Sequence, residues 1–158
     1  ALKMVIGNKD NFTKKIDTYS KENNSEVLLI SAKIESEISQ ITDFKDKQDF
    51  LESMGLKETG LKRVIKKGYE ILNYINYFTA GEKELRAWTI TKGTLAPSAA
   101  GTIHSDMEKG FIRAETISFN DYLSHKGEAG AKEKGKLRLE GKEYEVKDGD
   151  IMHFLFNV

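Results

Sequence analysis

The sequence predicts an α+β protein in which a small sheet packs around one helix in the second half of the chain. Short β-prone runs separated by glycine-containing turns fill most of that half. One helical stretch lies among them. The first half instead follows a strand, helix, strand order, which is typical of the edge of an α/β sheet.

The first half begins with two strand-like runs. Residues 2–8 and 26–31 are short and apolar, as expected for buried strands. Between them, apolar residues recur at helical spacing over residues 12–19, and Asn11 is suited to cap this helix at its N-terminus. The pattern predicts two strands of one sheet joined by a helix.

Two further helices are expected before the second half. Residues 43–54 form an amphipathic pattern that Gly55 is suited to end in a left-handed conformation. Residues 61–75 carry an apolar stripe with cations between its members. We expect these cations to form a solvated helix face: Lys62, Arg63, Lys66 and Lys67.

Strands predominate afterwards, which predicts a first domain at residues 1–76 and a second at 77–158. Residues 78–90 contain two β-prone runs around a glycine-containing turn, and residues 111–118 form one strand. Residues 136–158 follow as strands separated by turn-forming glycines. The single helix of this half is expected at residues 97–107, with a proline in its first turn. Five strands around one helix suggest a β-grasp sheet.

The composition limits the possible partners. Hydrophobic residues make up 39% and charged residues 32% of the chain, as in ordinary soluble globular proteins. Lys+Arg and Asp+Glu are both 25, so any contact with nucleic acid must be local. The sequence has no cysteine, and no apolar run approaches the length of about 20 residues that spans a bilayer. We therefore expect a cytoplasmic protein with no membrane partner.

Four blocks in the second half resemble the TGS domain of the YchF family of Obg-like ATPases. They follow one another as FTAGEKELRAWTI, GTIHSDMEKGFIRAETIS, GEAGAKEKGKLRLEGKEYEVKDGD and IMHFLFNV. The agreement is dense from about Gly68 to Val158. Ser98, Ser105 and Met107 depart from the family, which usually carries Gln, Thr and Phe at these positions.

This resemblance implies a ubiquitin-like β-grasp (TGS) domain preceded by the α/β C-terminal edge of a P-loop NTPase domain. It also implies a parent protein that hydrolyses ATP, sometimes GTP, and associates with the ribosome. The phosphate loop G-x-x-x-x-G-K-[ST] occurs nowhere in the sequence. We therefore expect a C-terminal fragment that is inactive alone and has no cofactor of its own. ATP or GTP and Mg²⁺ would be bound by the intact parent.

The resemblance also places base contacts of the intact parent on this chain. The family's Asn-x-x-Glu motif corresponds to residues 8–11, Asn-Lys-Asp-Asn, so Asn8 would contact the base. An amide at the fourth position suits adenine at least as well as guanine. Ser31, Ala32 and Lys33 would offer backbone N–H groups and the lysine stem to the base. The alternatives are an ordinary helix cap for residues 8–11 and strand-end packing for Ser31 to Lys33.

A set of cations in the second half is suited to meet the phosphates of ribosomal RNA. These candidate ribosome- or RNA-binding residues are Lys83, Arg86, Lys92, Lys109 and Arg113. We expect Arg86, Lys109 and Arg113 to share one surface. The alternative is that these residues only increase solubility. Trp88 is suited either to stack on a base or to join the core.

The other polar residues predict neither catalysis nor a metal site. His104 and His153 are far apart in the sequence and have no HxxxH or cysteine partner. The rival to an RNA-binding function is a ubiquitin-like protein-interaction module with no nucleic-acid role. Salt dependence separates the two, since phosphate contacts weaken steeply as salt rises, whereas an apolar interface changes little.

Overall fold

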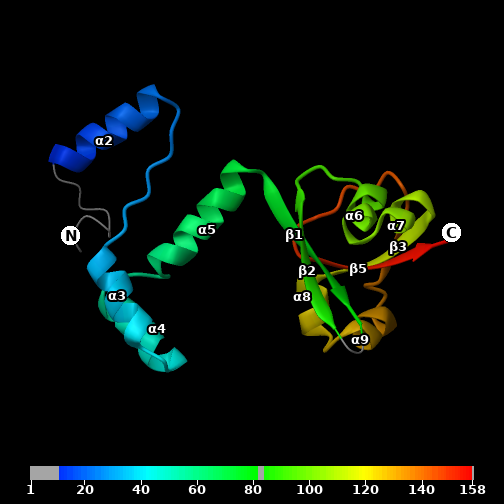
Figure 1. Cartoon of the computed structure of the whole chain (residues 1–158). Helices are drawn as coiled ribbons and strands as arrows, with labels where there is room; N and C mark the ends of the chain where they lie inside the picture. Colours follow the sequence, from blue (N-terminus) through cyan, green and yellow to red (C-terminus); the bar gives the residue numbers. More distant parts are fainter. Residues whose placement is uncertain (1–10, 82–83, 158) are drawn as a thin grey trace. The chain divides into compact units, whose positions relative to one another are not determined.

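A computed structural model describes residues 11–81 and 84–157 of the chain (Figure 1). The chain divides into two compact units, Ala1–Gly68 and Tyr69–Val158. The sequence suggested a boundary between residues 76 and 77. The strand expected at residues 2–8 lies outside the described residues.

All regular secondary structure in the described part of the first unit is helical. It contains α2 (Asn11–Glu22), α3 (Ala32–Gln40), α4 (Phe44–Ser53) and the beginning of α5 (Gly60–Ile71). Its small core is formed by α3 and α4: Ile34, Ile38 and Leu51, with Phe50 and Leu56 packed against them.

The sequence signals for α4 are confirmed. Asp43 caps this helix, because its carboxylate accepts hydrogen bonds from the backbone N–H groups of Lys45 at 2.8 Å and Asp46 at 3.0 Å. Gly55 follows its end with a φ of 67°, the left-handed conformation that glycine adopts without strain.

The helix expected around residues 12–19 is confirmed as α2, on which Phe12 is 68% exposed. Two other expectations for the first half are wrong. Residues 26–31 form no strand, because no other extended segment in the described part of this unit pairs with them. In addition, α5 ends at Ile71 rather than continuing to residue 75. Asn73, with a φ of 53°, redirects the chain into the following strand.

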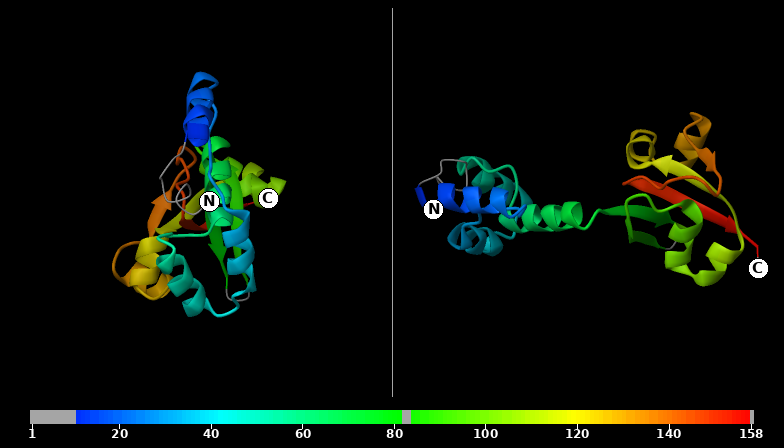
Figure 2. Two further views of the ribbon diagram at one scale, coloured as in Figure 1. Left: turned by 90° about the vertical axis from the view of Figure 1, so that its left-hand side faces the viewer. Right: turned by 90° about the horizontal axis from the view of Figure 1, so that it is seen from above.

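The second unit contains the five-stranded sheet that the sequence predicted. Its strands are β1 (Tyr74–Ala80), β2 (Leu85–Thr91), β3 (Phe111–Ser118), β4 (Arg138–Glu140) and β5 (Asp150–Phe156). The order across the sheet is β2-β1-β5-β3-β4. Only the pairing of β1 with β5 is parallel, and the other pairs described are antiparallel. Figures 1 and 2 show β5, drawn in red, between β1 and β3.

Helices cover both faces of this sheet. α6 (Ala96–Ile103) and α7 (Ser105–Lys109) pack on one face. α8 (Phe119–Ser124) and α9 (Glu128–Glu133) lie on the other, where the rings of Phe119 and Phe78 are 6.2 Å apart between centroids (Figure 1). The sequence pattern did not indicate α8 and α9, which have six residues each and are too short to show helical periodicity.

The single helix expected at residues 97–107 is two helices. His104 separates them, because its backbone is extended with φ −158° and ψ 139°. Its Nδ1 accepts a hydrogen bond from the backbone N–H of Asp106 at 3.2 Å, so the histidine caps α7. Pro97 lies in the first turn of α6, as predicted.

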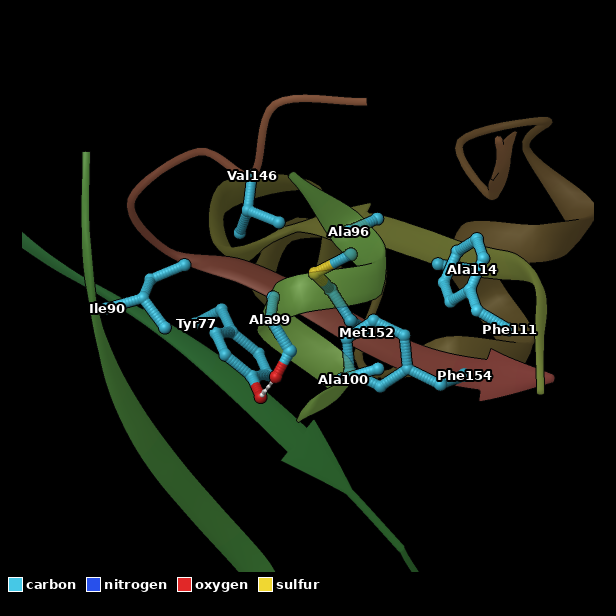
Figure 3. Close-up of a cluster of buried hydrophobic side chains, with 10 residues drawn as sticks. All are labelled: Tyr77, Ile90, Ala96, Ala99, Ala100, Phe111, Ala114, Val146, Met152 and Phe154. Atoms are coloured by element: carbon cyan, nitrogen blue, oxygen red, sulfur yellow. Dashed lines mark hydrogen bonds between the residues drawn. The ribbon is translucent and has the colours of Figure 1, made fainter. Parts of the chain in front are cut away.

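The main core lies between the sheet and α6 (Figure 3). Three fully buried alanines, Ala96, Ala99 and Ala100, let the helix approach the strands closely. The fully buried Tyr77 on β1 reaches α6, where its hydroxyl donates to the carbonyl of Ala99 at 2.8 Å. The remaining members of the core come from the strands and the last loop: Ile90, Phe111, Ala114, Val146, Met152 and Phe154.

A buried carboxylate fixes the loop before β5. Asp150 is 3% exposed and accepts hydrogen bonds from the Tyr144 hydroxyl at 2.7 Å, the Lys147 backbone N–H at 2.9 Å and the Arg138 guanidinium at 3.2 Å. The Arg138 guanidinium also lies 5.5 Å above the Tyr144 ring. Burial, aided by the bond to Asp150, raises the pKa of Tyr144 to about 12.

Candidate nucleic-acid interface

Arg86 and Trp88 form a stacked pair on the edge strand β2. They point to the same face because they are two residues apart in a strand. The guanidinium carbon of Arg86 lies 4.5 Å above the centroid of the Trp88 ring. The indole N–H of Trp88 donates to the Thr79 hydroxyl at 3.0 Å, which fixes the plane of the ring. Trp88 is half-buried and packs against the core, as one of the two sequence interpretations expected, and stacking on a base stays a prediction.

A solvent-open hollow of about 750 Å³ adjoins this pair. We call it the Trp88 hollow. Its walls come from the β1–β2 end of the sheet, from α6 and α7, and from β5. The lining is mainly apolar, with Arg86 as its cation, and includes Thr79, Glu84, Trp88, Ile103, Met107 and Phe156. An apolar concave site with few polar groups is the usual form of a ligand site.

Lys109 ends α7, the helix whose Met107 lines the Trp88 hollow. Two acidic residues of this helix already have partners within the unit. Asp106 lies 3.4 Å from His104, and Glu108 accepts a hydrogen bond from Ser98 at 3.1 Å. Lys109 is exposed and forms no ion pair with any described residue. Its charge is therefore available to an anion from solvent.

The expectation that Arg86, Lys109 and Arg113 share one surface is wrong. Arg86 pairs with Thr79 in the sheet, on the face that carries Tyr77 and the main core. Arg113 pairs with Leu155 and is adjacent to the buried Ala114, so it points to the opposite face. Successive residues of a strand alternate between faces, which separates these two arginines.

Lys92, another of the predicted RNA-binding cations, does not line the Trp88 hollow. Lys92 is exposed just beyond the end of β2, where its backbone N–H donates to the carbonyl of Asn73 at 2.7 Å. That end of β2 is remote from Glu84, which precedes the strand and lines the hollow. Lys83 lies outside the described residues.

A second group of cations lies around α8 and α9 and was not predicted from the sequence. Lys126, Lys132 and Lys134 are exposed and form no ion pair with the described part of the chain. Lys126 adopts a φ of 58°, which is unusual for a lysine. The run of alternating lysines around Gly135 was the available signal. Lys136 in this run is instead 3.5 Å from Asp121.

The segment expected to contact a nucleotide base lies at the N-terminus of α3. Ser31 is buried and caps the helix, since its hydroxyl accepts a hydrogen bond from the backbone N–H of Ile34 at 3.4 Å. Ala32 and Lys33 occupy the first turn, where backbone N–H groups have no acceptor within the helix. The Lys33 ammonium is 3.9 Å from Glu37, and its side chain is 86% exposed. A base contact of these residues stays a prediction, and Asn8 lies outside the described residues.

The described residues contain neither a cluster of metal ligands nor a membrane-spanning helix. No group of three or more His, Cys, Asp or Glu side chains within residues 11–81 and 84–157 is arranged to hold a metal ion. None of the described helices is long and apolar enough to cross a bilayer. His153 is an exposed residue of β5.

The fold and these surfaces define an α+β sheet unit with an open, mainly apolar hollow beside Arg86 and Trp88. Residues 74–157 match the family model YchF-GTPase_C, described as "Protein of unknown function (DUF933)". The chain therefore belongs to the YchF family, which confirms the resemblance found in the sequence and the predicted fold class.

Similar proteins cover nearly all of the chain. It is 56% identical over 144 residues to "Ribosome-binding ATPase YchF" of Bacillus subtilis, covering 91% of this chain and 39% of that protein. The protein of the same name from Escherichia coli O157:H7 is 58% identical over 134 residues, with 85% and 37% covered. The structure of the Schizosaccharomyces pombe YchF GTPase superposes with a TM-score of 0.81 at 35% identity, covering 95% and 40%. The chain thus spans about two fifths of the length of these relatives.

Proposed function

We propose that the chain works as part of a ribosome-associated, nucleotide-dependent NTPase, and that its second unit is the RNA- or ribosome-binding module. The observation that carries this proposal is the 56% identity, over 91% of the chain, to a protein named a ribosome-binding ATPase. Unpaired cations on the unit support it, because phosphate contacts need charges that are not already neutralised. Work on ribosomes implies a cytoplasmic location.

The first unit would contribute to the nucleotide site of the whole protein. In this proposal residues 1–76 belong to the nucleotide-binding part and residues 77–158 form the TGS domain. Ser31, Ala32 and Lys33 would face the base of ATP or GTP. The phosphates and Mg²⁺ require a phosphate loop that this sequence does not contain. The chain alone would therefore neither hold ATP tightly nor hydrolyse it.

A protein-interaction module is the second candidate. Exposed apolar side chains on β3, β4 and α8 favour it, since such residues are common in protein interfaces. They are Ile112, Leu139 and Leu123, with exposed fractions of 55%, 58% and 59%. In this candidate the cations contribute only solubility, and nucleic acid has no role.

Pelleting of the 158-residue chain with ribosomes at low and high salt separates the two candidates. The RNA-binding module predicts binding that weakens steeply with salt, by roughly one unit of the logarithmic slope for each phosphate contact. Binding that salt leaves unchanged would instead support the protein-interaction module.

Because Arg86 and Arg113 lie on opposite faces, Arg86→Ala and Arg113→Ala tested separately identify the face that meets the ribosome. The variant on the bound face should lower the salt slope, and the other should not. Lys14→Ala on α2 is a matched control, because it removes one exposed charge from the first unit. Equal behaviour of all three variants would contradict a phosphate contact at either arginine.

A further inference from the structure

We infer that the Trp88 hollow binds one unstacked nucleobase of single-stranded RNA, with the base stacked on the Arg86 guanidinium. This inference rests on the proposed function and names the ligand of one of its surfaces. The hollow is concave, open to solvent and about 750 Å³ in volume, which is ample for a single base. Its location beside a tryptophan and an arginine determines the kind of ligand.

The contact of Arg86 with Trp88 supports the stacking of a base at this position. The guanidinium carbon of Arg86 lies over the Trp88 ring, 4.5 Å from the ring centroid, which is within the range of a cation–π contact. Trp88 cannot tilt freely, because its N–H is bonded to Thr79 at 3.0 Å. RNA-binding proteins stack unpaired bases on aromatic rings and on arginine planes. The Arg86 guanidinium beside this fixed ring offers a planar group for such a contact.

The apolar lining of the Trp88 hollow also suits a nucleobase. Ile103, Met107 and Phe156 line the hollow, and Phe156 is 42% exposed. A flat aromatic heterocycle can contact these side chains while its ring edge stays near water. Methionine is well suited to this role, since its flexible thioether adapts to aromatic surfaces.

The charged residues around the Trp88 hollow indicate which part of a nucleotide can enter it. Arg86 and Lys109 have no ion-pair partner among the described residues, whereas Asp106 and Glu108 on α7 have their own polar partners. Neither contact neutralises a carboxylate, because Ser98 carries no charge and His104 is charged only when protonated, so these acids offset the two cations. Glu84, also in the lining, repels a phosphate that enters. An uncharged base is therefore expected inside the hollow, and its phosphates outside.

The chain provides its own reporter, because Trp88 is its only tryptophan. We would titrate the 158-residue chain with a short single-stranded oligoribonucleotide and follow tryptophan emission. The same oligonucleotide made entirely of abasic sugar phosphates tests the base. The base-bearing strand should change the emission and bind about tenfold more tightly than the abasic strand. Equal affinity with unchanged emission would overturn the inference.

Arg86→Lys provides the decisive variant. It keeps the positive charge and the Trp88 reporter but loses the planar guanidinium. We expect it to bind base-bearing and abasic strands equally, with the salt dependence of the wild type. A variant that still prefers the base-bearing strand as strongly as the wild type would refute stacking on Arg86. Lys142→Ala, an exposed change in the turn after β4, should leave the preference intact.

Failure of this inference differs from failure of the proposed function. Salt-sensitive pelleting with ribosomes, combined with no response of Trp88 to RNA, removes the base site and leaves the ribosome-binding module. If neither pelleting nor RNA binding depends on salt, both proposals fail. A Trp88 response to a short apolar peptide, with none to RNA, would assign the hollow to a protein partner and overturn the inference.

Discussion

The carboxylate of Glu35 accepts a hydrogen bond from the backbone N–H of Gly60 at 2.7 Å, and a longer one from Leu61 at 3.3 Å. Gly60 begins α5, so α3 supplies acceptors for N–H groups that a helix leaves unpaired at its start. A Cβ at position 60 would lie 2.7 Å from the same carboxylate oxygen and 2.9 Å from Ile30 Cγ2. A side chain at position 60 would therefore displace the Glu35 carboxylate from this contact.

Replacement of Glu35 should loosen the start of α5. Glu35→Ala removes a charged acceptor and leaves half-buried N–H groups unpaired, so we expect a loss of about 1–2 kcal/mol in local stability. Hydrogen exchange of the Gly60 and Leu61 amides measures the effect directly. Glu37→Ala is the control on the same helix, because Glu37 contacts only the exposed Lys33 at 3.9 Å in the described structure. Equal exchange rates in the two variants would show that Glu35 does not hold α5.

Asp150 should be the most sensitive polar position of the second unit. Asp150→Asn keeps the shape but replaces one carboxylate oxygen with an NH2 donor, which must face either the Arg138 guanidinium at Oδ1 or the Tyr144 hydroxyl at Oδ2. We expect a loss of about 2 kcal/mol in the free energy of unfolding, measured by urea denaturation. Tyr144→Phe is the milder comparison, since it removes one hydrogen bond and should cost about 1 kcal/mol. A larger loss for Tyr144→Phe than for Asp150→Asn would contradict this account.

Tyr77 makes stability depend on alkaline pH. Burial raises the pKa of its phenol from 10.0 to about 12, because the charged phenolate is disfavoured in the core. A pKa that folding raises contributes stability that is complete below pH 10 and is lost as the pH rises through about 12. The free energy of unfolding, measured by urea denaturation, should fall by on the order of 2 kcal/mol across this window.

The control for this prediction is Tyr77→Phe, which should be less stable near neutral pH but should lose less stability between pH 10 and 12. Its hydroxyl bond to the Ala99 carbonyl is absent at every pH. If the two proteins lose stability in parallel over this range, the alkaline transition does not belong to Tyr77. Absorbance of the phenolate at each pH follows the ionisation itself.

Lys126 should lower the stability of the second unit while contributing to ribosome binding. It occupies the position after α8 where the backbone N–H of Gly127 donates to the carbonyl of Tyr122 at 2.8 Å, an arrangement in which glycine is the usual residue. Lys126→Gly relieves the left-handed φ of 58° and should raise the free energy of unfolding by about 0.5–1 kcal/mol. If the lysine contacts RNA phosphate, the same variant should pellet less with ribosomes at low salt.

Lys132→Ala on α9 is the comparison for Lys126→Gly, because it removes a nearby charge without changing a left-handed residue. We expect it to weaken pelleting by a similar amount with little change in the thermal midpoint. A stabilised Lys126→Gly variant that pellets like the wild type would show that this cation is not a contact.

Local signals predicted some elements well. The helix α4 is set by Asp43 at its start and Gly55 after its end, both of which act through neighbouring backbone groups. The bounds of β3 are those that the sequence indicated. In both elements the pattern and the local chemistry agree, so little depends on distant residues.

Other elements depended on contacts that a local pattern does not contain. Residues 26–31 have the composition of a strand, but in the described structure no other strand of the first unit pairs with them. The break at His104 uses a side-chain cap in the middle of a helical pattern. The helices α8 and α9 are six residues long, so their composition could not distinguish them from a loop.

The sequence by itself determined the family, the α+β class and the presence of a tryptophan with nearby cations, because these follow from residue identity and local periodicity. Only the tertiary structure decided which of these residues share a surface. Parallel pairing of β1 with β5 joins segments far apart in the chain, and side chains alternate between the two faces of a strand. Arg86 consequently stacks on Trp88 beside the hollow, while Arg113 points away from it on the opposite face.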